Sequence, residues 1–215
     1  MKILPFEVFR GAHWRERKPR WPKYLSTVLH FDLSPFPVLT TPRLLLRALS
    51  AEDAPALFRM RSDPRVMHYI PKPLFIKAAE AKELLEGFQR AFARHEQVMW
   101  AITLKGTNET CGIIGYWRIL AEHHRAEIGY FIDPAQWNQG LMTEAVAAVL
   151  DLGFGRMGLH SVEAATDPAN TASIRVLERN GFVREGRFKQ NIRSNAVFVD
   201  SVVYSRLASG TQREA

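Results

Sequence analysis

The chain has 215 residues, of which 47% are hydrophobic and 24% charged, an ordinary composition for one globular domain with an appendage. Its single cysteine, Cys111, excludes an internal disulfide, and no apolar run approaches the roughly 18 residues that cross a membrane. The net charge is +7, and the first thirty residues alone hold seven basic and two acidic side chains. We expect a cytoplasmic protein without a membrane segment.

Residues 1–37 predict a basic, aromatic N-terminal extension, because their pattern is irregular and five prolines interrupt it. Trp14, Trp21 and Tyr24 lie among the basic residues, so the segment could meet RNA phosphates and stack on bases. The alternative is a solvated extension that lies on the domain or on a dimer partner. Whether the protein is a monomer or a homodimer, and whether it associates with ribosomes, stays open.

The domain proper is expected over residues 38–210 and opens with a short apolar strand at 44–46. Ser50, spaced three residues from Asp53, marks a helix start, and apolar residues at helical spacing predict a long helix over 76–95. Period and turn signals then predict strands at 98–104, 111–120 and 126–132, a helix over 138–157, a strand at 161–166, a helix within 167–180, and strands at 182–187 and 197–207. This order indicates a mixed α/β class and not a purely doubly wound sheet.

The clearest local signal is a strand followed by a glycine-containing turn and a helix. The predicted strand 126–132 leads through Asp133 and Pro134 to Gly140, where the helix begins. The first turn of a helix leaves backbone N–H groups without partners, and together with the helix dipole these donors suit a pyrophosphate. Gly140 would let the backbone approach such a ligand closely. A single glycine before a helix is also typical of a plain turn.

A second polar signal lies at the start of the helix predicted within 167–180. Asn170 and Ser173 are three residues apart, about one helical turn, and therefore share a face. Both side chains can hydrogen-bond a ligand along that face. Asn170 also fits the position of a helix N-cap, and the two roles are compatible.

Taken together, these motifs resemble the GNAT superfamily of acetyl-CoA-dependent N-acetyltransferases. The glycine turn, then Asn170-x-x-Ser173 and Gly181-Phe182, is similar to the acetyl-CoA half of these enzymes. The opening Leu39-Thr40-Thr41-Pro42-Arg43 and the closing Asp200-Ser201-Val202-Val203-Tyr204 resemble the RimJ/RimL branch, which acetylates the N-termini of ribosomal proteins. The resemblance implies a mixed α/β GNAT acyl-CoA N-acyltransferase fold, in which flanking helices cover a central, mostly antiparallel sheet splayed at the cofactor cleft.

The resemblance further implies acetyl-CoA as the co-substrate, in a cleft between the strands 126–132 and 161–166. It places the cofactor contacts at Phe131, Ile132, Trp137, Asn138, Gln139, Gly140, Leu141, Met142, Thr143, Asn170 and Ser173. Two positions depart from the family pattern. Met142 is bulkier than the usual small residue of the turn, and Leu177 occupies the place where many members carry a tyrosine as general acid.

Glu127 is the candidate general base. Alternation along its strand places Tyr130 on the core face and Glu127, Gly129 and Phe131 on the other face. A carboxylate beside a glycine suits an open cleft, and the position resembles that of the strand glutamate that acts as base in histone acetyltransferases of the superfamily. The alternative is a salt bridge to a neighbouring strand.

Ser173 is the second catalytic candidate, since resemblance to RimL-type enzymes places it near the leaving thiolate, where it would supply a proton. The alternative is a helix serine without a chemical role. We expect Cys111 to be a buried structural thiol, and we expect no metal site.

The resemblance implies the N-terminal α-amine of a protein, and of a ribosomal protein in particular, as the acceptor. An α-amino group, with a pKa near ~8, needs less help from a base than a lysine near ~10.4. A small amine, such as a polyamine, an amino acid or an antibiotic, is the alternative acceptor. A non-catalytic acyl-CoA-binding module is the third hypothesis, and thioester turnover separates it from the other two.

Overall fold

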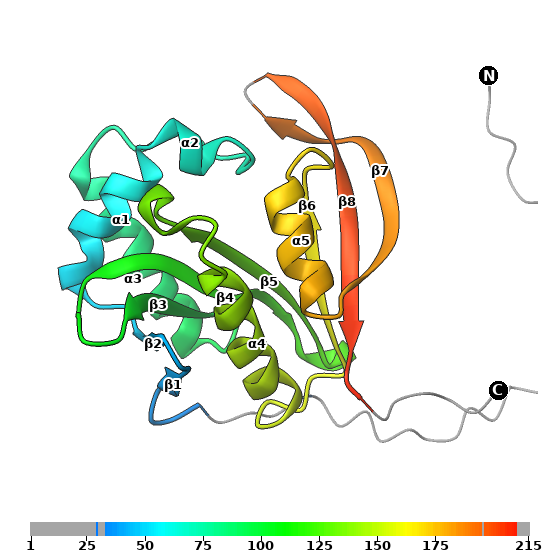
Figure 1. The fold of residues 1–215 in the computed structure, drawn as a ribbon, viewed down its shortest axis with the longest axis horizontal. Helices are drawn as coiled ribbons and strands as arrows, with labels where there is room; N and C mark the ends of the chain where they lie inside the picture. Colours follow the sequence, from blue (N-terminus) through cyan, green and yellow to red (C-terminus); the bar gives the residue numbers. More distant parts are fainter. Residues whose placement is uncertain (1–28, 30–32, 195, 210–215) are drawn as a thin grey trace, which may run out of the picture.

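A computed structural model describes residue 29, residues 33–194 and residues 196–209 (Figure 1). The first 28 residues of the predicted extension, and with them Trp14, Trp21 and Tyr24, lie outside the described residues. The described part forms one eight-stranded sheet in the order β1-β2-β3-β4-β5-β6-β8-β7. The predicted mixed α/β fold, with a mostly antiparallel central sheet and flanking helices, is confirmed.

The strands of this sheet are β1 (Leu39–Thr40), β2 (Leu44–Ala48), β3 (Val98–Leu104), β4 (Thr110–Leu120), β5 (Arg125–Ile132), β6 (Ser161–Thr166), β7 (Val183–Ser194) and β8 (Val197–Leu207). The α-helices are α1 (Ala54–Arg61), α2 (Pro64–Met67), α3 (Ala78–Ala93), α4 (Leu141–Phe154) and α5 (Thr171–Arg179). Short 3₁₀ turns precede α1, β5 and the turn into α4, at Ala51–Asp53, Ala121–His123 and Pro134–Gln136.

The sheet opens between β5 and β6, the one parallel pair among the described strands. The two strands pair only from Arg125 to Glu127 and from Ser161 to Glu163. Beyond that point β5 continues against β4 as far as Ile132, and β6 continues against β8 as far as Thr166. The facing edges past Glu127 therefore carry backbone groups that this pairing does not use, as in an exposed sheet edge.

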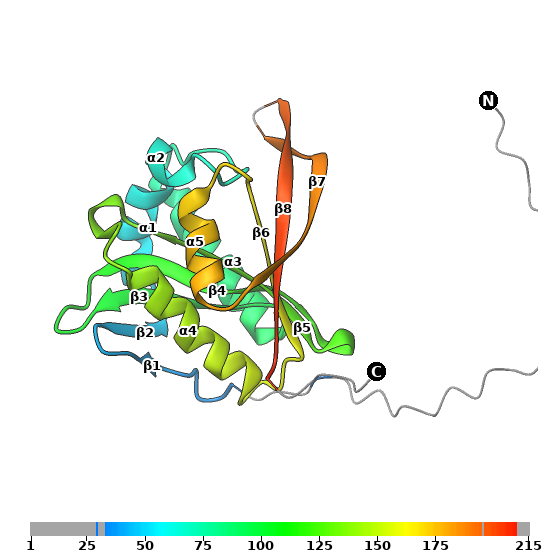
Figure 2. The ribbon, with the colours of Figure 1, turned by 45° about the vertical axis from the view of Figure 1, so that its right-hand side comes forward.

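Helices cover both faces of the sheet, and each face has its own apolar cluster. Figure 2 shows α4 and α5 on the near side, with α3 behind the sheet. Ala126 and Ile128 of β5 belong to the cluster under α4, whereas Phe131 packs against the cluster formed with α1 and α3. The alternation predicted for this strand is thus confirmed, and β5 separates the two clusters.

Some boundaries differ from the prediction. The helix expected over 138–157 begins only at Leu141, because Asn138 and Gly140 adopt positive φ values of 60° and 74°. The strand expected at 182–187 runs on to Ser194, and α2 was not expected at all. The long helix α3 begins close to its predicted start, where the Glu80 carboxylate accepts hydrogen bonds from the N–H groups of Ile76 and Lys77.

The end of the predicted extension packs against the domain. Leu29 and Leu33 are buried in the cluster under α4. Phe36 makes an edge contact with Trp100, with ring centroids 5.6 Å apart, and the Pro37 carbonyl accepts a hydrogen bond of 2.7 Å from Trp100 Nε1. A domain boundary at residue 38 stays a prediction, and these contacts favour a start nearer to residue 29. No helix in the described ranges has both the length and the apolar character to cross a bilayer.

Candidate active site

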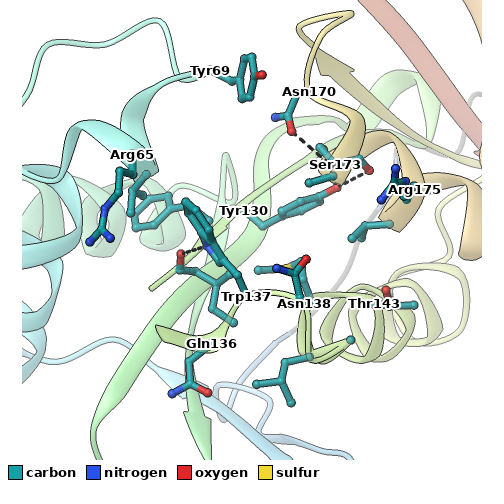
Figure 3. A pocket seen from close by; sticks show the side chains of 18 of the residues that line it. Arg65, Tyr69, Tyr130, Gln136, Trp137, Asn138, Thr143, Asn170, Ser173 and Arg175 are labelled. Carbon is teal, nitrogen blue, oxygen red and sulfur yellow. Dashed lines mark hydrogen bonds between the residues drawn. The ribbon is translucent and has the colours of Figure 1, made fainter. Parts of the chain in front are cut away.

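A pocket of about 460 Å³ lies at the end of β5, between the start of α4 and α5, and no residue of β6 lines it. Its wall comes from the end of β5, the turn into α4, the first turn of α4, one side of α5 along its length, and α2 with the loop that follows it (Figure 3). The residues that line it are Arg65, Val66, Tyr69, Ile70, Tyr130, Phe131, Ile132, Gln136, Trp137, Asn138, Gly140, Leu141, Met142, Thr143, Asn170, Ala172, Ser173, Arg175, Val176 and Arg179.

The first turn of α4 forms one end of the pocket. Gly140 is the N-cap residue with φ of 74°, a left-handed conformation that favours glycine, and it offers no side chain to cap the helix. The first intrahelical bond runs from the N–H of Glu144 to the carbonyl of Gly140. The N–H groups of the turn before it, at Leu141, Met142 and Thr143, therefore remain available to a ligand.

Glu144 would oppose an anion at this helix start, but its carboxylate is engaged on the far side. Thr41 Oγ1 and the backbone N–H of Arg43 both donate to Glu144 Oε1, and Arg43 Nε donates to Oε2 at 2.7 Å. Burial alone would raise the pKa of Glu144, but these hydrogen bonds outweigh it and hold the pKa below the usual value. The Thr41-Pro42-Arg43 motif thus ties the segment before β2 to the start of α4.

The first turn of α5 forms the opposite wall. Asn170 Oδ1 accepts a hydrogen bond of 3.1 Å from the N–H of Ser173, so the predicted N-cap is confirmed. Ser173 Oγ lies 2.9 Å from the hydroxyl of Tyr130 on β5 (Figure 3). Asn170 and Ser173 both line the pocket, as their shared helical face predicted.

Trp137 closes the side of the pocket near the end of β5. Its Nε1 donates a hydrogen bond of 3.0 Å to the carbonyl of Ile132, which fastens the turn to the strand. The side chains at the two positions that depart from the family pattern, Met142 and Leu177, do not fill the pocket. Met142 is buried in the cluster under α4 while it touches the pocket, and Leu177 is fully buried in the same cluster.

Ten of the eleven predicted cofactor contacts, Ser173 among them, line the pocket, and one does not. Those that line the pocket are Phe131, Ile132, Trp137, Asn138, Gly140, Leu141, Met142, Thr143, Asn170 and Ser173. Gln139 does not line it, because its carbonyl accepts from Arg43 Nη1 and its side chain donates to the carbonyl of Ala135.

Glu127 also lies outside the pocket lining, at the point where β5 and β6 part. Its buried carboxylate accepts a hydrogen bond of 2.7 Å from Arg118 on β4, and Arg118 is 3.6 Å from Glu163 on β6. Burial raises the pKa of Glu127, and the nearby Arg118 offsets only part of that rise. The geometry matches the salt-bridge alternative, and the role as a base stays a prediction.

Cys111 is buried, with its Sγ 3.3 Å from the carbonyl of Ile102 on β3, and it does not line the pocket. Burial raises the pKa of this thiol to about 11, which keeps it protonated near neutral pH. These features fit the expected structural thiol.

The pocket contains residues that the sequence did not single out. The sequence pattern places Tyr130 in the core and predicts no helix before Tyr69. The Tyr69 hydroxyl donates to the carbonyl of Ala169 at 3.2 Å. Arg175 and Arg179 are spaced i, i+4 on the helix that carries Ser173, so their side chains lie on adjacent turns. The i, i+4 spacing of these two arginines is the sequence signal that could have predicted a basic wall of the pocket.

Residues 43–183 match the family model described as "Acetyltransferase (GNAT) domain". The chain belongs to the GNAT acetyltransferase family. It is 34% identical to the uncharacterized N-acetyltransferase YoaA of Bacillus subtilis, over 79% of this chain and 96% of that protein. It is 28% identical to the ribosomal-protein-serine acetyltransferase of Escherichia coli, over 63% of this chain and 75% of that protein. The structure of RimL, a ribosomal L7/L12 alpha-N-protein acetyltransferase, in complex with coenzyme A superposes with a TM-score of 0.74 at 24% identity, covering 80% and 98% of the two chains.

The protein is thus a GNAT N-acetyltransferase, and its co-substrate is acetyl-CoA. The residues of the pocket fit that molecule on physical grounds. A helix start with open N–H groups and two neighbouring arginines suit phosphate groups, and the unpaired strand edges at the splay suit an amide-bearing arm.

Proposed function

We propose that this N-acetyltransferase transfers the acetyl group of acetyl-CoA to the N-terminal α-amine of a protein, with a ribosomal protein as the favoured acceptor. The observation that carries the proposal is the pocket wall. Its lining residues, where the acceptor amine has to meet the thioester, include no aspartate or glutamate. A polyamine would need carboxylates for its several positive charges, whereas a peptide N-terminus presents only one amine. The likeness to the ribosomal-protein-serine acetyltransferase of Escherichia coli supports the same acceptor.

The cofactor contacts follow from the two helix starts. The pyrophosphate binds the N–H groups of the first turn of α4, from Gly140 to Thr143, and Asn138 and Trp137 flank it. The pantetheine arm extends along the open edge of β5 at Phe131 and Ile132. Asn170 holds the first turn of α5, and the thioester lies near Ser173. Gln139 lies outside the pocket lining, and its contact with the cofactor stays a prediction.

The reaction requires little from the side chains. A neutral amine attacks the thioester carbonyl, a C–N bond forms, and the C–S bond breaks with its electron pair on sulfur. Because an α-amine has a pKa near ~8, a useful fraction is neutral at physiological pH, and water can accept the proton that the nitrogen loses. Glu127 acts as a base only through water, since the pocket lining does not include it. Ser173 stabilises the departing thiolate.

A panel of acceptors tests the proposal. The full chain is incubated with acetyl-CoA and lysine-free peptides that have a free N-terminus, with N-terminally blocked peptides that contain lysine, or with spermidine, and thiol release is recorded. We expect turnover with the free N-termini alone, and mass spectrometry should place the acetyl group on the α-nitrogen. Faster turnover with spermidine or with the blocked peptides would identify the other acceptor class. Bound CoA without any thiol release across a broad panel of amines would support the non-catalytic hypothesis.

A further inference from the structure

Tyr130 joins the two walls of the pocket at the level of Ser173. It comes from β5, past the last residue that pairs with β6, and Ser173 comes from the first turn of α5. Its hydroxyl lies 2.9 Å from Ser173 Oγ and 3.5 Å from the Ser173 carbonyl oxygen. Figure 3 shows the Tyr130 ring directed across the pocket at this serine.

The direction of this hydrogen bond decides where the Ser173 proton points. The Ser173 carbonyl oxygen can only accept, so Tyr130 is the donor in the 3.5 Å contact, whereas either hydroxyl can donate in the 2.9 Å contact. Burial raises the pKa of Tyr130 to about 12, so the phenol keeps that proton across the physiological range. With Tyr130 as the donor, the Ser173 hydroxyl retains its own proton for a partner in the pocket.

We propose that Tyr130 is the positioning residue for Ser173: its hydroxyl holds the serine oxygen from behind and directs the serine proton at the sulfur of the departing coenzyme A. The proposal rests on the proposed assignment of this pocket to acetyl-CoA. Leu177 occupies the place of the family's tyrosine acid and is buried in the core, so that position has no hydroxyl to offer. The Tyr130–Ser173 pair places a hydroxyl with a fixed direction in the pocket instead.

The step balances without a buried tyrosinate. As the C–S bond breaks, its electron pair passes to sulfur, and the Ser173 O–H stabilises the thiolate through a charge-assisted hydrogen bond. The nitrogen's surplus proton leaves to water, and the thiolate is protonated from solvent on release. A donor behind the serine polarises its O–H bond, so the two hydrogen bonds strengthen each other. Tyr130 acts on the sulfur only through Ser173.

The thiol of bound coenzyme A reports this arrangement without any acceptor. Coenzyme A is bound to the full chain, and its thiolate is titrated by ultraviolet absorbance in the wild type and in the Tyr130→Phe variant. Phe keeps the ring but removes the hydroxyl. We expect wild-type protein to lower the pKa of the bound thiol relative to free coenzyme A, and Tyr130→Phe to raise it again by about one unit. Ser173→Ala should raise it by at least as much, and the double variant should add nothing further.

Tyr116→Phe is the matched control, because Tyr116 is also buried and donates at 2.9 Å to a backbone carbonyl, that of Val149, away from the pocket lining. It should lower the unfolding temperature and leave the bound thiol's pKa unchanged. With an acceptor peptide, Tyr130→Phe should lower kcat about tenfold while KM for acetyl-CoA stays within about twofold.

Two different results would contradict the proposed function and the positioning role of Tyr130 separately. If wild-type protein does not bind coenzyme A, the proposed function falls and this inference falls with it. If coenzyme A binds but Tyr130→Phe leaves the thiol pKa and kcat unchanged, or if its effect simply multiplies with that of Ser173→Ala, the positioning role is wrong while the proposed function survives.

Discussion

Gly140 determines how α4 presents its first N–H groups to the pocket. Its φ of 74° lies in the left-handed region, where a side chain costs roughly 1 kcal/mol or more. We expect Gly140→Val to weaken coenzyme A binding by at least ~1 kcal/mol, about fivefold, because the strained turn moves the N–H donors away from the phosphates. Calorimetric titration with coenzyme A measures this change in affinity.

Gly106→Val is the control for that change. Gly106 has a φ of 86° with no atom within 4 Å of an added Cβ, and it lies in the β3–β4 turn outside the pocket lining. It should lose stability in the same way without losing affinity for coenzyme A. Equal losses of affinity in the two variants would show that the effect of Gly140→Val is general strain.

Glu127 can be tested against its own neighbour. Glu163 pairs with it in register on β6 and shares Arg118, and it forms a further ion pair with Arg125. If Glu127 is a general base, Glu127→Gln should lower kcat by ~10²-fold or more at unchanged affinity for coenzyme A, and Glu163→Gln should not. Measuring kcat of both variants between pH 6 and 9 distinguishes a base from a structural carboxylate. Similar small losses of kcat in both variants would show that Glu127 is only one member of an ion-pair cluster.

Individual residues were predictable where the signal is local. Asn170 and Ser173 share a helical turn, and Gly140 begins a helix, so short-range geometry alone identified three of the pocket residues. Tyr130 was assigned correctly to the core face, but its hydroxyl meets a serine far along the chain. Sequence periodicity describes which face a side chain occupies and carries no information on partners across the fold.

A buried carboxylate fastens the start of α1 to the sheet. Asp53, at the end of the 3₁₀ turn before α1, accepts two hydrogen bonds from Arg47 of β2 and one from Thr110 of β4. Its Oδ2 also accepts at 2.7 Å from the N–H of Ser50. This network holds α1 at the cluster against which Phe131 packs, and so supports the pocket from behind.

The same network predicts a pH dependence. Burial would raise the pKa of Asp53, but the hydrogen bonds from Arg47 and Thr110 outweigh it, so the folded pKa lies below the ordinary value of 3.8. Stability from this group is therefore present above pH 3.8 and lost as the pH falls through the lower folded value. Asp53→Asn should cost about 3 kcal/mol at pH 7, because it leaves Arg47 without its charged partner.

Urea unfolding at a series of pH values checks this prediction. The difference between Asp53→Asn and the wild type should shrink as the pH falls below 3.8. Glu96→Gln serves as the control, since Glu96 pairs with Arg94 while both side chains are more than half exposed, and it should change stability little at any pH. A cost of Asp53→Asn that is the same at every pH would contradict the account.

Elements were predictable where period and turn chemistry agree. β3, β6 and β8 have the bounds that alternation gave, because each carries apolar residues into a buried face and ends at a turn. The sequence pattern does not predict the second half of β7, because its residues are mostly exposed and because the register between β7 and β8 shifts at two places. The splay between β5 and β6 has no local sequence signal, and the family resemblance supplied it.

At the scale of the whole molecule, the domain includes residues that precede the recognisable motifs. Leu33 is 2% exposed in the main cluster, and Pro37 accepts the hydrogen bond of the fully buried Trp100. A chain that begins at residue 38 loses both and leaves the indole N–H unsatisfied. We expect it to be less stable by several kcal/mol, about 2 for Leu33 and 1–3 for the orphaned donor, whereas a chain that begins at residue 29 keeps both contacts.

Unfolding temperatures and coenzyme A affinities of the two truncated chains and the full chain test this boundary. The chain that begins at residue 29 should match the full chain in both. If the chain that begins at residue 38 is equally stable, the contacts of Leu33 and Pro37 are dispensable.

Ribosome co-sedimentation of the full chain and of the chain beginning at 29, at rising salt, separately tests the proposed partner role of the basic residues. Their attraction to a partner is screened over about 8 Å at physiological salt.

The most direct test of the central claim is a crystal structure of the full chain with coenzyme A. The account predicts the pyrophosphate at about 2.7–3.2 Å from N–H groups of residues 140–143. It also predicts the pantetheine arm between β5 and β6, and the thiol beside Ser173 with Tyr130 behind it. Coenzyme A bound elsewhere on the protein, or with its thiol on the far side of the sheet from Ser173, would contradict it.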